Sequence, residues 1–266
     1  MADTTPDASA PKRRRRPPRA VTVERTELVT PRLTRITFGG EGLAGFDTPR
    51  PGAHMKLFFP PAGMEWPPKD PEADGPRPPS RTYTPRRFDA ARNELEVEFV
   101  HHGDGLAANW AQSAKVGDPL SLAGPGGGYD IADDAERVVL VADETSMPAA
   151  GMVLESVPAG CEAIVLCEVI DGGDERELSP VVSAETRWLH RAPTNARQGS
   201  LLERAVIDLG DLGPNTYFWI ACEAATMRRI KKRLMTEGGY AASNLHTRGY
   251  WKLGETNYPD HDYGED

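Results

Sequence analysis

The sequence has few cysteines, and none of them lies in a metal-binding or redox pattern. Cys161, Cys167 and Cys222 are the only three among 266 residues, with no Cys-x-x-Cys pair and no histidine at zinc-ligand spacing. Cys161 and Cys167 lie in an apolar run, which predicts buried thiols in a reducing compartment. A disulfide framework, a metal site and a cysteine-ligated iron–sulfur cluster are therefore not expected, and a chain of this length can bury a core without such links.

Long apolar runs are also missing. No stretch is long enough to span a bilayer, and the polar, Pro-rich start lacks the apolar segment of a signal peptide. The four arginines at 13–16 are not followed by an apolar segment either, so no twin-arginine signal is expected. We predict a cytoplasmic protein with no membrane contact.

Positive charge is in deficit. Lys and Arg number 31 against 40 Asp and Glu, a net charge of −9, which disfavours a general nucleic-acid binder. The charge is unevenly distributed, with a basic head in residues 1–19 and an acidic tail in residues 255–266. Charged termini are usually solvated. Nucleic-acid binding through Arg13–Arg16 stays open as an alternative that predicts strongly salt-sensitive binding.

The first half of the chain predicts an antiparallel β-barrel. After a disordered tail over residues 1–19, short β-branched stretches broken by Pro and Gly fill a domain over residues 20–130. In Glu94–Val100, apolar Leu95, Val97 and Phe99 alternate with acids, the period of a half-buried strand. Residues 60–80 are crowded with prolines and predict a long surface loop. Strands are expected at 28–38, 54–59, 81–88, 94–100 and 119–122.

The second half predicts a Rossmann-like parallel α/β domain over residues 131–254, followed by the acidic tail. Apolar strands are expected at 137–142, 163–170, 187–190 and 217–222, and helices at 147–157, 201–209 and 224–236. Strands that alternate with helices indicate a parallel sheet covered on both faces. The last of these helices carries five cations (Arg228, Arg229, Lys231, Lys232 and Arg233), which suit either a solvated face or the extra phosphate of NADPH.

A Gly-x-Gly-x-x-Gly fingerprint is absent, so the chemistry must be sought in other motifs. The first is Arg81-Thr82-Tyr83-Thr84 on a predicted strand, where Arg81 and Tyr83 point to one face and the threonines to the other. An aromatic wall, a hydroxyl and a cation are what a flavin and its diphosphate require. Taken alone, the tetrad is weak evidence, because Tyr and Thr are good strand formers and most such tetrads are structural.

The second motif is a glycine turn followed by a short helix. Gly103 and Gly105 in His102-Gly103-Asp104-Gly105 allow a tight turn, and the helix around Ala108 and Trp110 presents free N–H groups at its start. Such a helix start can bind a diphosphate. The third motif, Asp143-Glu144-Thr145, follows the first α/β strand at the ligand-binding end of the sheet, where it either faces a nicotinamide or caps the next helix.

These motifs, in this order and with Gly249-Tyr250-Trp251-Lys252 near the end, resemble the siderophore-interacting protein family. These are FAD-dependent ferric-siderophore reductases of the ferredoxin–NADP reductase-like superfamily. The resemblance covers about residues 21–254. It implies FAD contacts in the tetrad 81–84 and at His102, Gly103, Ala108 and Trp110. It implies nicotinamide-facing residues at Asp143, Glu144, Thr145 and Glu223, and places Trp251 and Lys252 in the C-terminal signature.

The resemblance also implies an acceptor site. Lys56 matches a lysine that the family places near the flavin opening. Bulky, anionic ferric siderophores call for a basic mouth, for which Lys56, Arg86, Arg87 and Lys252 are candidates. His101 departs from the family pattern and predicts a core histidine. No general acid or base is required, because a flavin takes a hydride and releases single electrons.

Several alternatives stay open. The electron donor can be NADH, NADPH or reduced ferredoxin. Arg187 and Arg191 are further candidates for binding a phosphate group of the nicotinamide cofactor. The acceptor can be a quinone or a redox partner instead of a siderophore, or the protein can bind a siderophore without turnover. We expect a monomer.

Overall fold

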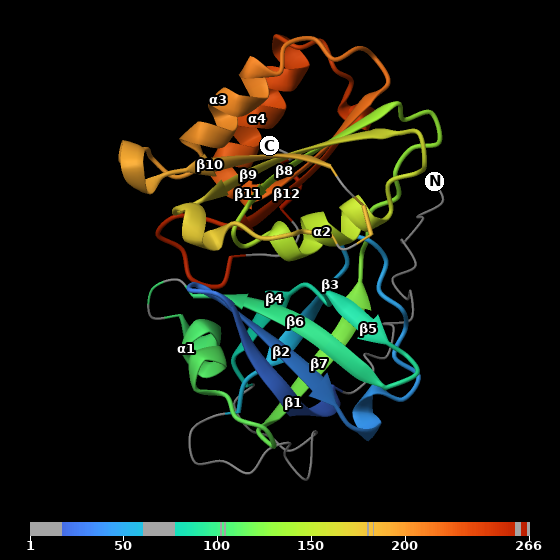
Figure 1. Ribbon diagram of the computed structural model, residues 1–266, viewed down its shortest axis with the longest axis vertical. Coiled ribbons are helices and arrows are strands. Elements are labelled where there is room, and N and C mark those ends of the chain that lie inside the picture. Colours follow the sequence, from blue (N-terminus) through green and yellow to red (C-terminus); the bar gives the residue numbers. More distant parts are fainter. Residues whose placement is uncertain are drawn as a thin grey trace, which may run out of the picture.

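The computed structural model describes residues 18–60, 78–101, 103, 105–179, 181–182, 184–258 and 262–264. The arginine run at 13–16, most of the Pro-rich loop expected at 60–80, and His102 lie outside these residues. Within them, the chain forms two domains stacked end to end (Figure 1).

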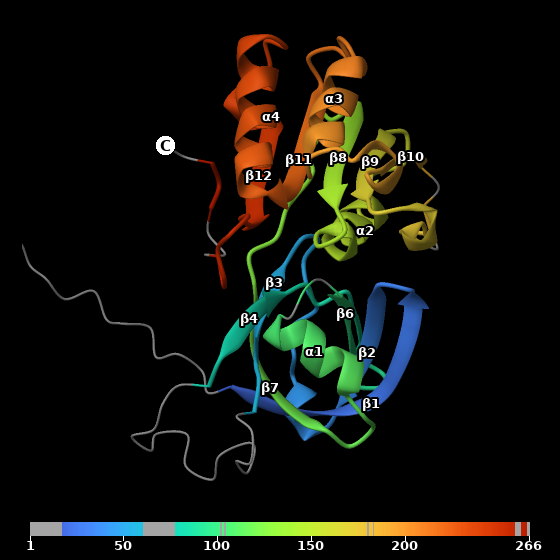
Figure 2. The same ribbon diagram turned by 90° about the vertical axis from the view of Figure 1, so that its left-hand side faces the viewer.

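The first domain is a seven-stranded antiparallel sheet with the order β4-β3-β7-β1-β2-β6-β5. The sheet curls around its own apolar core as a barrel (Figures 1 and 2). Its strands are β1 (Arg19–Thr30), β2 (Leu33–Gly39), β3 (His54–Phe58), β4 (Ser80–Tyr83), β5 (Arg87–Asp89), β6 (Glu94–Val100) and β7 (Pro119–Gly126). The 3₁₀ helix η1 (Glu41–Leu43) follows β2, and helix α1 (Leu106–Ser113) connects β6 with β7.

The barrel core follows the alternation seen in the sequence. Leu95, Val97 and Phe99 on β6 are fully buried. Glu98 departs from the pattern, because it is 3% exposed although its parity is that of the outer face. Arginines at the domain interface surround Glu98, so tertiary contacts bury a side chain that strand periodicity would expose.

Two strand predictions in the barrel need correction. The stretch around Pro31 is one hairpin of two long strands, because Pro31 lies at its turn between Thr30 and Leu33. The strand expected at 81–88 is interrupted between Tyr83 and Arg87. Pro85 lies in this gap and has no N–H to donate to a sheet ladder, which explains the break.

The second domain is a five-stranded parallel sheet with the order β10-β9-β8-β11-β12. The fold class predicted from the sequence, a barrel followed by a parallel α/β domain, is confirmed. The strands are β8 (Arg137–Asp143), β9 (Glu162–Val169), β10 (Glu185–His190), β11 (Thr216–Glu223) and β12 (Leu245–Trp251). The helices are α2 (Met147–Glu155), α3 (Ser200–Asp208) and α4 (Ala224–Thr236), with 3₁₀ turns η2 (Gly172–Asp174), η3 (Ala192–Thr194) and η4 (Ala242–Asn244).

Helices cover both faces of this sheet and build two separate cores. On one face, Ala149 and Val153 of α2 pack against Val138 and Leu140 of β8. On the other face, α3 and α4 pack against the alternate residues of β8 and β11 (Figure 2). Strand β12 was not anticipated, since its residues Leu245-His246-Thr247-Arg248 lack the continuous apolar character of the other strands.

Ion pairs connect the two domains. Arg32 at the β1–β2 turn contacts Asp174 of η2 at 2.8 Å, and Arg176 of the α/β domain contacts the buried Glu98 at 2.6 Å. Helix α2 faces the barrel (Figure 1). The arrangement of the domains is therefore set by specific charged contacts, which define the width of the space between them.

The C-terminal residues pack onto the α/β domain where the structure describes them. Asp262 pairs with Arg228 of α4 at 2.8 Å, and its backbone carbonyl accepts from the N–H of Gly249 at 2.8 Å. A purely solvated acidic tail is therefore wrong at these residues. Among the thiols, Cys167 and Cys222 are buried and Cys161 is half-exposed, which corrects the prediction for Cys161.

Candidate active site

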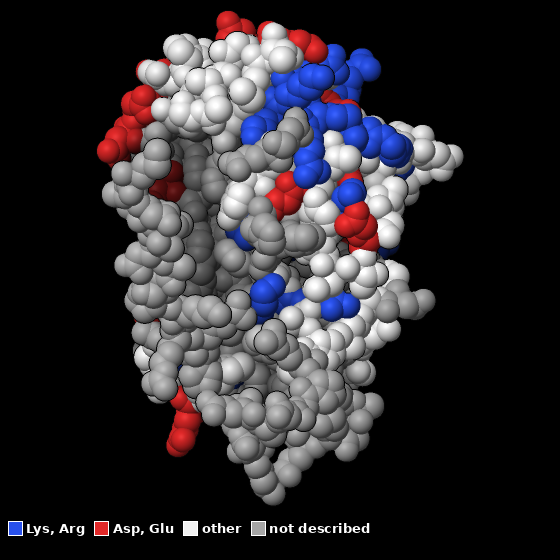
Figure 3. Space-filling view, turned by 180° about the vertical axis from the view of Figure 1, so that it is seen from behind, with Lys and Arg blue, Asp and Glu red and all other residues white. Residues whose placement is uncertain are grey.

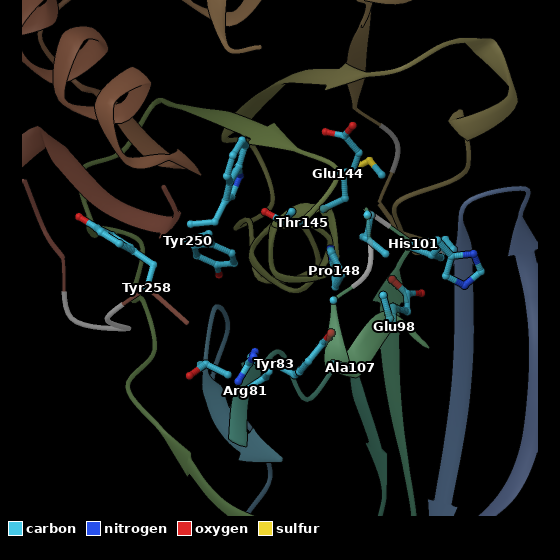
Figure 4. Close-up of a pocket in the computed structure, with 18 of the residues that line it drawn as sticks. Arg81, Tyr83, Glu98, His101, Ala107, Glu144, Thr145, Pro148, Tyr250 and Tyr258 are labelled. Atoms are coloured by element: carbon cyan, nitrogen blue, oxygen red, sulfur yellow. The ribbon is translucent and has the colours of Figure 1, made fainter. Parts of the chain in front are cut away.

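A pocket of about 1220 Å³ lies between the two domains. Its walls come from β4, the turn and first residues of α1, the turn after β8, and the end of β12 with the segment that follows it. Figure 4 shows Arg81 and Tyr83 of the barrel on the side of the pocket opposite Glu144 and Thr145 of the α/β domain. The volume exceeds that of typical small-ligand sites, about 300–1,000 Å³, so it suits more than one ligand.

All four residues of Arg81-Thr82-Tyr83-Thr84 line the pocket. This differs from the predicted alternation. β4 ends at Tyr83, so Thr84 is no longer constrained by the strand, whereas Thr82 reaches the pocket from within β4. The Tyr83 ring packs against Phe99, with ring centroids 4.5 Å apart, and burial raises the pKa of its hydroxyl, so Tyr83 is neutral at physiological pH. The Arg81 guanidinium donates to the carbonyl of Ser80 at 2.9 Å.

The start of α1 is suited to an anion. Its N-cap is Gly105, which has no side chain to satisfy the first N–H groups, and Leu106, Ala107 and Ala108 line the pocket. Gly103 also lines the pocket and has a φ of +50°, as the predicted tight turn requires. A helix start whose N-cap has no side chain, in one pocket with Arg81, fits the diphosphate of a dinucleotide cofactor.

Trp110 does not belong to this wall. Its ring packs in the barrel core, with centroids 5.5 Å from Phe59 and 5.9 Å from Phe99. Trp110 shares the core-facing side of α1 with Ala107 and Ala111 and is not among the described residues that line the pocket, so its contact with FAD stays a prediction. His101 lines the pocket at its edge and shares a 2.8 Å hydrogen bond with Thr34, so it is not purely a core histidine.

The turn after β8 is organised by Asp143, which is 1% exposed. Its carboxylate accepts from the N–H of Thr145 at 3.0 Å and from the indole N–H of Trp251 at 2.8 Å. Burial, together with the charge of Glu144, raises the pKa of Asp143 to about 7. Asp143 thus positions its neighbours, while Glu144, Thr145 and Trp251 line the pocket themselves.

Glu223 is not among the pocket-lining residues that the structure describes. Its side chain accepts from the N–H of Thr226 at 2.8 Å and so caps α4. The sequence could have indicated this role, because Glu223 directly precedes a helical pattern. Glu223 therefore has a structural role at this helix start, and its place facing the nicotinamide stays a prediction.

The four basic candidates separate into two kinds. Lys252 lines the pocket, 2.5 Å from Glu255. The exposed Lys56 is not among the described lining residues, but it donates to the hydroxyl of the lining residue Thr82 at 3.2 Å. Arg86 is buried and contacts Glu155 of α2 at 2.7 Å, so its place in an acceptor site is corrected. Arg87 is exposed on β5 and is not found among the described residues that line the pocket.

Sequence reasoning overlooked a charged cluster at the carboxyl end of the parallel sheet. Both terminal nitrogens of Arg191 donate to Glu144, one of them at 3.0 Å, and one also contacts Glu168 at 3.4 Å. Glu168 is fully buried, and its burial raises the pKa of its carboxyl. A charged residue inside the apolar run Val165-Leu166-Cys167-Glu168-Val169 was the available signal.

The cations of α4 form a surface patch at the top of the rear face (Figure 3). Arg228 pairs with Asp262, Arg229 with Glu203 and Arg233 with Glu237. Within the described ranges, no α4 residue lines the pocket. The patch is a solvated helix face, and it does not supply cations to a ligand in the pocket.

Two searches on the described residues gave negative results. None of the helices is long and apolar enough to cross a membrane. No group of three or more His, Cys, Asp or Glu side chains in the described ranges could hold a metal ion.

A curled antiparallel barrel joined to a parallel α/β domain, with a large pocket between them, defines a two-domain flavin-dependent oxidoreductase. Residues 22–129 match the siderophore-interacting FAD-binding domain, and residues 135–254 match the siderophore-interacting protein domain. The chain belongs to the siderophore-interacting protein family.

Named relatives and a solved structure agree with this assignment. The chain is 31% identical to the NADPH-dependent ferric-chelate reductase of Escherichia coli, over 88% of this chain and 92% of the relative. It is 29% identical to the ferric vibriobactin reductase ViuB of Vibrio cholerae, over 92% and 93%. A siderophore utilization protein from T. fusca matches with a TM-score of 0.79 and 32% identity, over 93% of this chain and 98% of that one.

Proposed function

We propose that this protein reduces ferric siderophores, with FAD passing electrons from NAD(P)H to the chelated iron. The observation that carries the proposal is the pocket itself. It joins Arg81-Thr82-Tyr83-Thr84 on the barrel and Glu144-Thr145, at the turn after β8 of the α/β domain, in one space. A donor and a resident cofactor can therefore meet there.

The residues present fit FAD. The unsatisfied N–H groups at the start of α1 and the Arg81 guanidinium would hold its diphosphate, and Tyr83 and Thr84 would border its ring. When bound, the flavin supplies the ability to take two electrons at once and to release them singly. Each nicotinamide hydride can thus reduce two ferric ions.

The acceptor side needs charge and no metal ligands. Lys56 and Lys252 would attract an anionic ferric siderophore by long-range electrostatics. Siderophores hold Fe(III) with hard oxygen donors, which bind the softer Fe(II) less well, so reduction alone loosens the metal. No proton transfer by a side chain is required at the iron, and we assign no general acid or base.

Anaerobic flavin spectroscopy on the full-length, FAD-loaded protein tests the proposal. The flavin is first reduced by light, without nucleotide, and a ferric tris-catecholate siderophore is then added. Recovery of the oxidised flavin spectrum together with trapping of Fe(II) by a colorimetric chelator is the expected result. A protein that takes up no FAD contradicts the proposal, and so does a reduced flavin that a siderophore fails to reoxidise.

The same experiment separates the alternatives. A siderophore-binding protein without turnover would bind the ferric complex without using a flavin. A reductase for a quinone would be reoxidised by the quinone and not by the siderophore. We further propose that the enzyme works as a monomer in the cytoplasm, which sedimentation and cell fractionation would test.

A further inference from the structure

The edge of the parallel sheet that faces the pocket is unusually rich in buried carboxylates. Asp143, Glu144, Glu168 and Glu223 follow or end strands β8, β9 and β11, and each is 7% exposed or less. In open parallel sheets this edge binds nucleotides, whose phosphates are anionic. Four acids at such an edge therefore restrict which nucleotide can bind there.

Two helix starts at this edge already hold an anion from the chain itself. The Glu168 carboxylate accepts from the N–H groups of Gly199 at 2.6 Å, Leu201 at 3.1 Å and Leu202 at 3.2 Å, at the start of α3. Glu223 caps α4 in the same way. Neither helix start is open to a phosphate group of a ligand, because a phosphate would have to displace a buried carboxylate.

The nearby cation is similarly committed. Arg191 lines the pocket beside Glu144, and its side chain is 13% exposed. Its guanidinium bridges Glu144 and Glu168, so the three groups together carry one net negative charge. Arg187 and Arg197, which flank this region in sequence, pair with Glu185 and Glu203, each at 2.7 Å.

NADH and NADPH differ only by a 2′-phosphate. An arginine near the ribose accommodates that phosphate in many dinucleotide-binding domains, whereas an acid favours the unphosphorylated ribose. For Arg191 to bind the phosphate, it would have to leave Glu144, whose side chain is 10% exposed and would then be unpaired. Glu168, on the other side of Arg191, would also repel the 2′-phosphate.

We propose that the adenosine ribose of the donor lies at the Glu144–Arg191–Glu168 cluster, in place of the nicotinamide that the family resemblance implies at Glu144. The cluster then makes this protein select NADH over NADPH, with Glu144 as the specificity-determining residue. The inference rests on the proposed function and names the donor of that reaction. Neutralising Glu144 should release Arg191 to bind a 2′-phosphate, so a single substitution should reverse or abolish the selection.

Binding of two nucleotide fragments tests this inference without turnover. Full-length, FAD-loaded protein is titrated by calorimetry with 5′-ADP and with 2′,5′-ADP, which differ by the 2′-phosphate alone. We expect 5′-ADP to bind about tenfold more tightly to the wild type, and Glu144→Gln to shift the ratio toward 2′,5′-ADP by about tenfold. The ratio of kcat/KM for NADH and NADPH should move in the same direction.

Glu162→Gln is the matched control. Glu162 also pairs with an arginine, Arg137 at 2.7 Å, but at the opposite end of the same sheet. This variant should leave the nucleotide ratio unchanged. The double variant Glu144→Gln, Arg191→Met should lose the gain in 2′,5′-ADP binding, which would assign that gain to Arg191.

Tighter binding of 2′,5′-ADP to the wild type would overturn the inference, and this comparison needs no variant to fold. A Glu144→Gln ratio within twofold of the wild type would also overturn it, as would failure to bind either fragment. Reoxidation of light-reduced flavin by a ferric siderophore involves no nucleotide. Normal reoxidation with the opposite nucleotide preference therefore rejects this inference and retains the proposed function.

Discussion

The two walls of the pocket treat negative charge in opposite ways. On the barrel wall, α1 begins at a glycine with no capping side chain, and Arg81 lines the same pocket. On the α/β wall, Arg191 is held by carboxylates, and behind the wall Glu168 and Glu223 cap α3 and α4 without being among the described lining residues. The barrel wall is thus prepared for an anion from outside, whereas the α/β wall has supplied its own.

This contrast matches the needs of a flavin-dependent reductase. A resident cofactor must stay bound through many turnovers, and open N–H groups with a guanidinium favour tight binding of its diphosphate. A donor must leave after each hydride transfer, and an edge already filled with carboxylates holds its phosphates less strongly. Four substitutions test how far the contrast extends.

The largest effect should come from the contact that holds the two walls together. Arg86→Met leaves Glu155 and the carbonyl of Leu178 without their partner, which should destabilise the fold by about 2–3 kcal/mol. Thermal unfolding should show a midpoint lower by about 5–10 °C. Arg87→Met, at the exposed neighbouring position, is the control. If Arg86→Met left the thermal midpoint unchanged and raised the KM for the siderophore, Arg86 would be a residue of the acceptor site and not a structural one.

The next effect concerns the barrel wall alone. Arg81→Ala removes the cation beside the open start of α1, which should weaken FAD binding about 30-fold, since charge-assisted hydrogen bonds contribute about 2 kcal/mol. Fluorescence titration of the apoprotein with FAD measures this change. Arg87→Ala should bind FAD as the wild type does. If both variants bound FAD equally well, the barrel wall would not be the diphosphate site.

A smaller effect is expected at the mouth. Lys56→Glu should lower kcat/KM for an anionic ferric siderophore about fivefold to tenfold at low salt, through lost electrostatic attraction, and should leave FAD bound. Lys115→Glu changes the same charge at an exposed site away from the pocket and serves as the control. Equal kinetics for Lys56→Glu and the wild type would reject a basic mouth at this position.

The last effect is a pH dependence in the α/β domain, behind the pocket wall, and it appears only when the pH is changed. The pKa of Asp143 is raised to about 7, so the folded state binds more protons than the unfolded state between about pH 4 and 7. Stability from this group is therefore lost as pH rises through that window and levels off above it. Asp143→Asn should remove this slope, which linkage puts at about 2–3 kcal/mol, or about 5–10 °C in thermal midpoint, between pH 5 and 8. Parallel midpoint curves for the two proteins would contradict a proton on Asp143.

Local patterns in the sequence were sufficient for the architecture and for part of the site. Alternating Leu95, Val97 and Phe99 identified a barrel strand, continuous apolar runs identified the parallel sheet, and the glycine turn identified the start of α1. These signals are readable because each depends on residues that are close in the chain. Strand β12 escaped detection because polar residues interrupt its pattern.

Only the tertiary structure decided which charged side chains serve the pocket. Arg86 and Arg87 are adjacent, yet one is buried against α2 and the other faces solvent. Arg191 and Glu144 are 47 residues apart, and their pairing exists only because parallel strands bring their carboxyl ends to one edge. The role of a charged side chain depends on its partner and on its burial, and neither is a local property of the sequence.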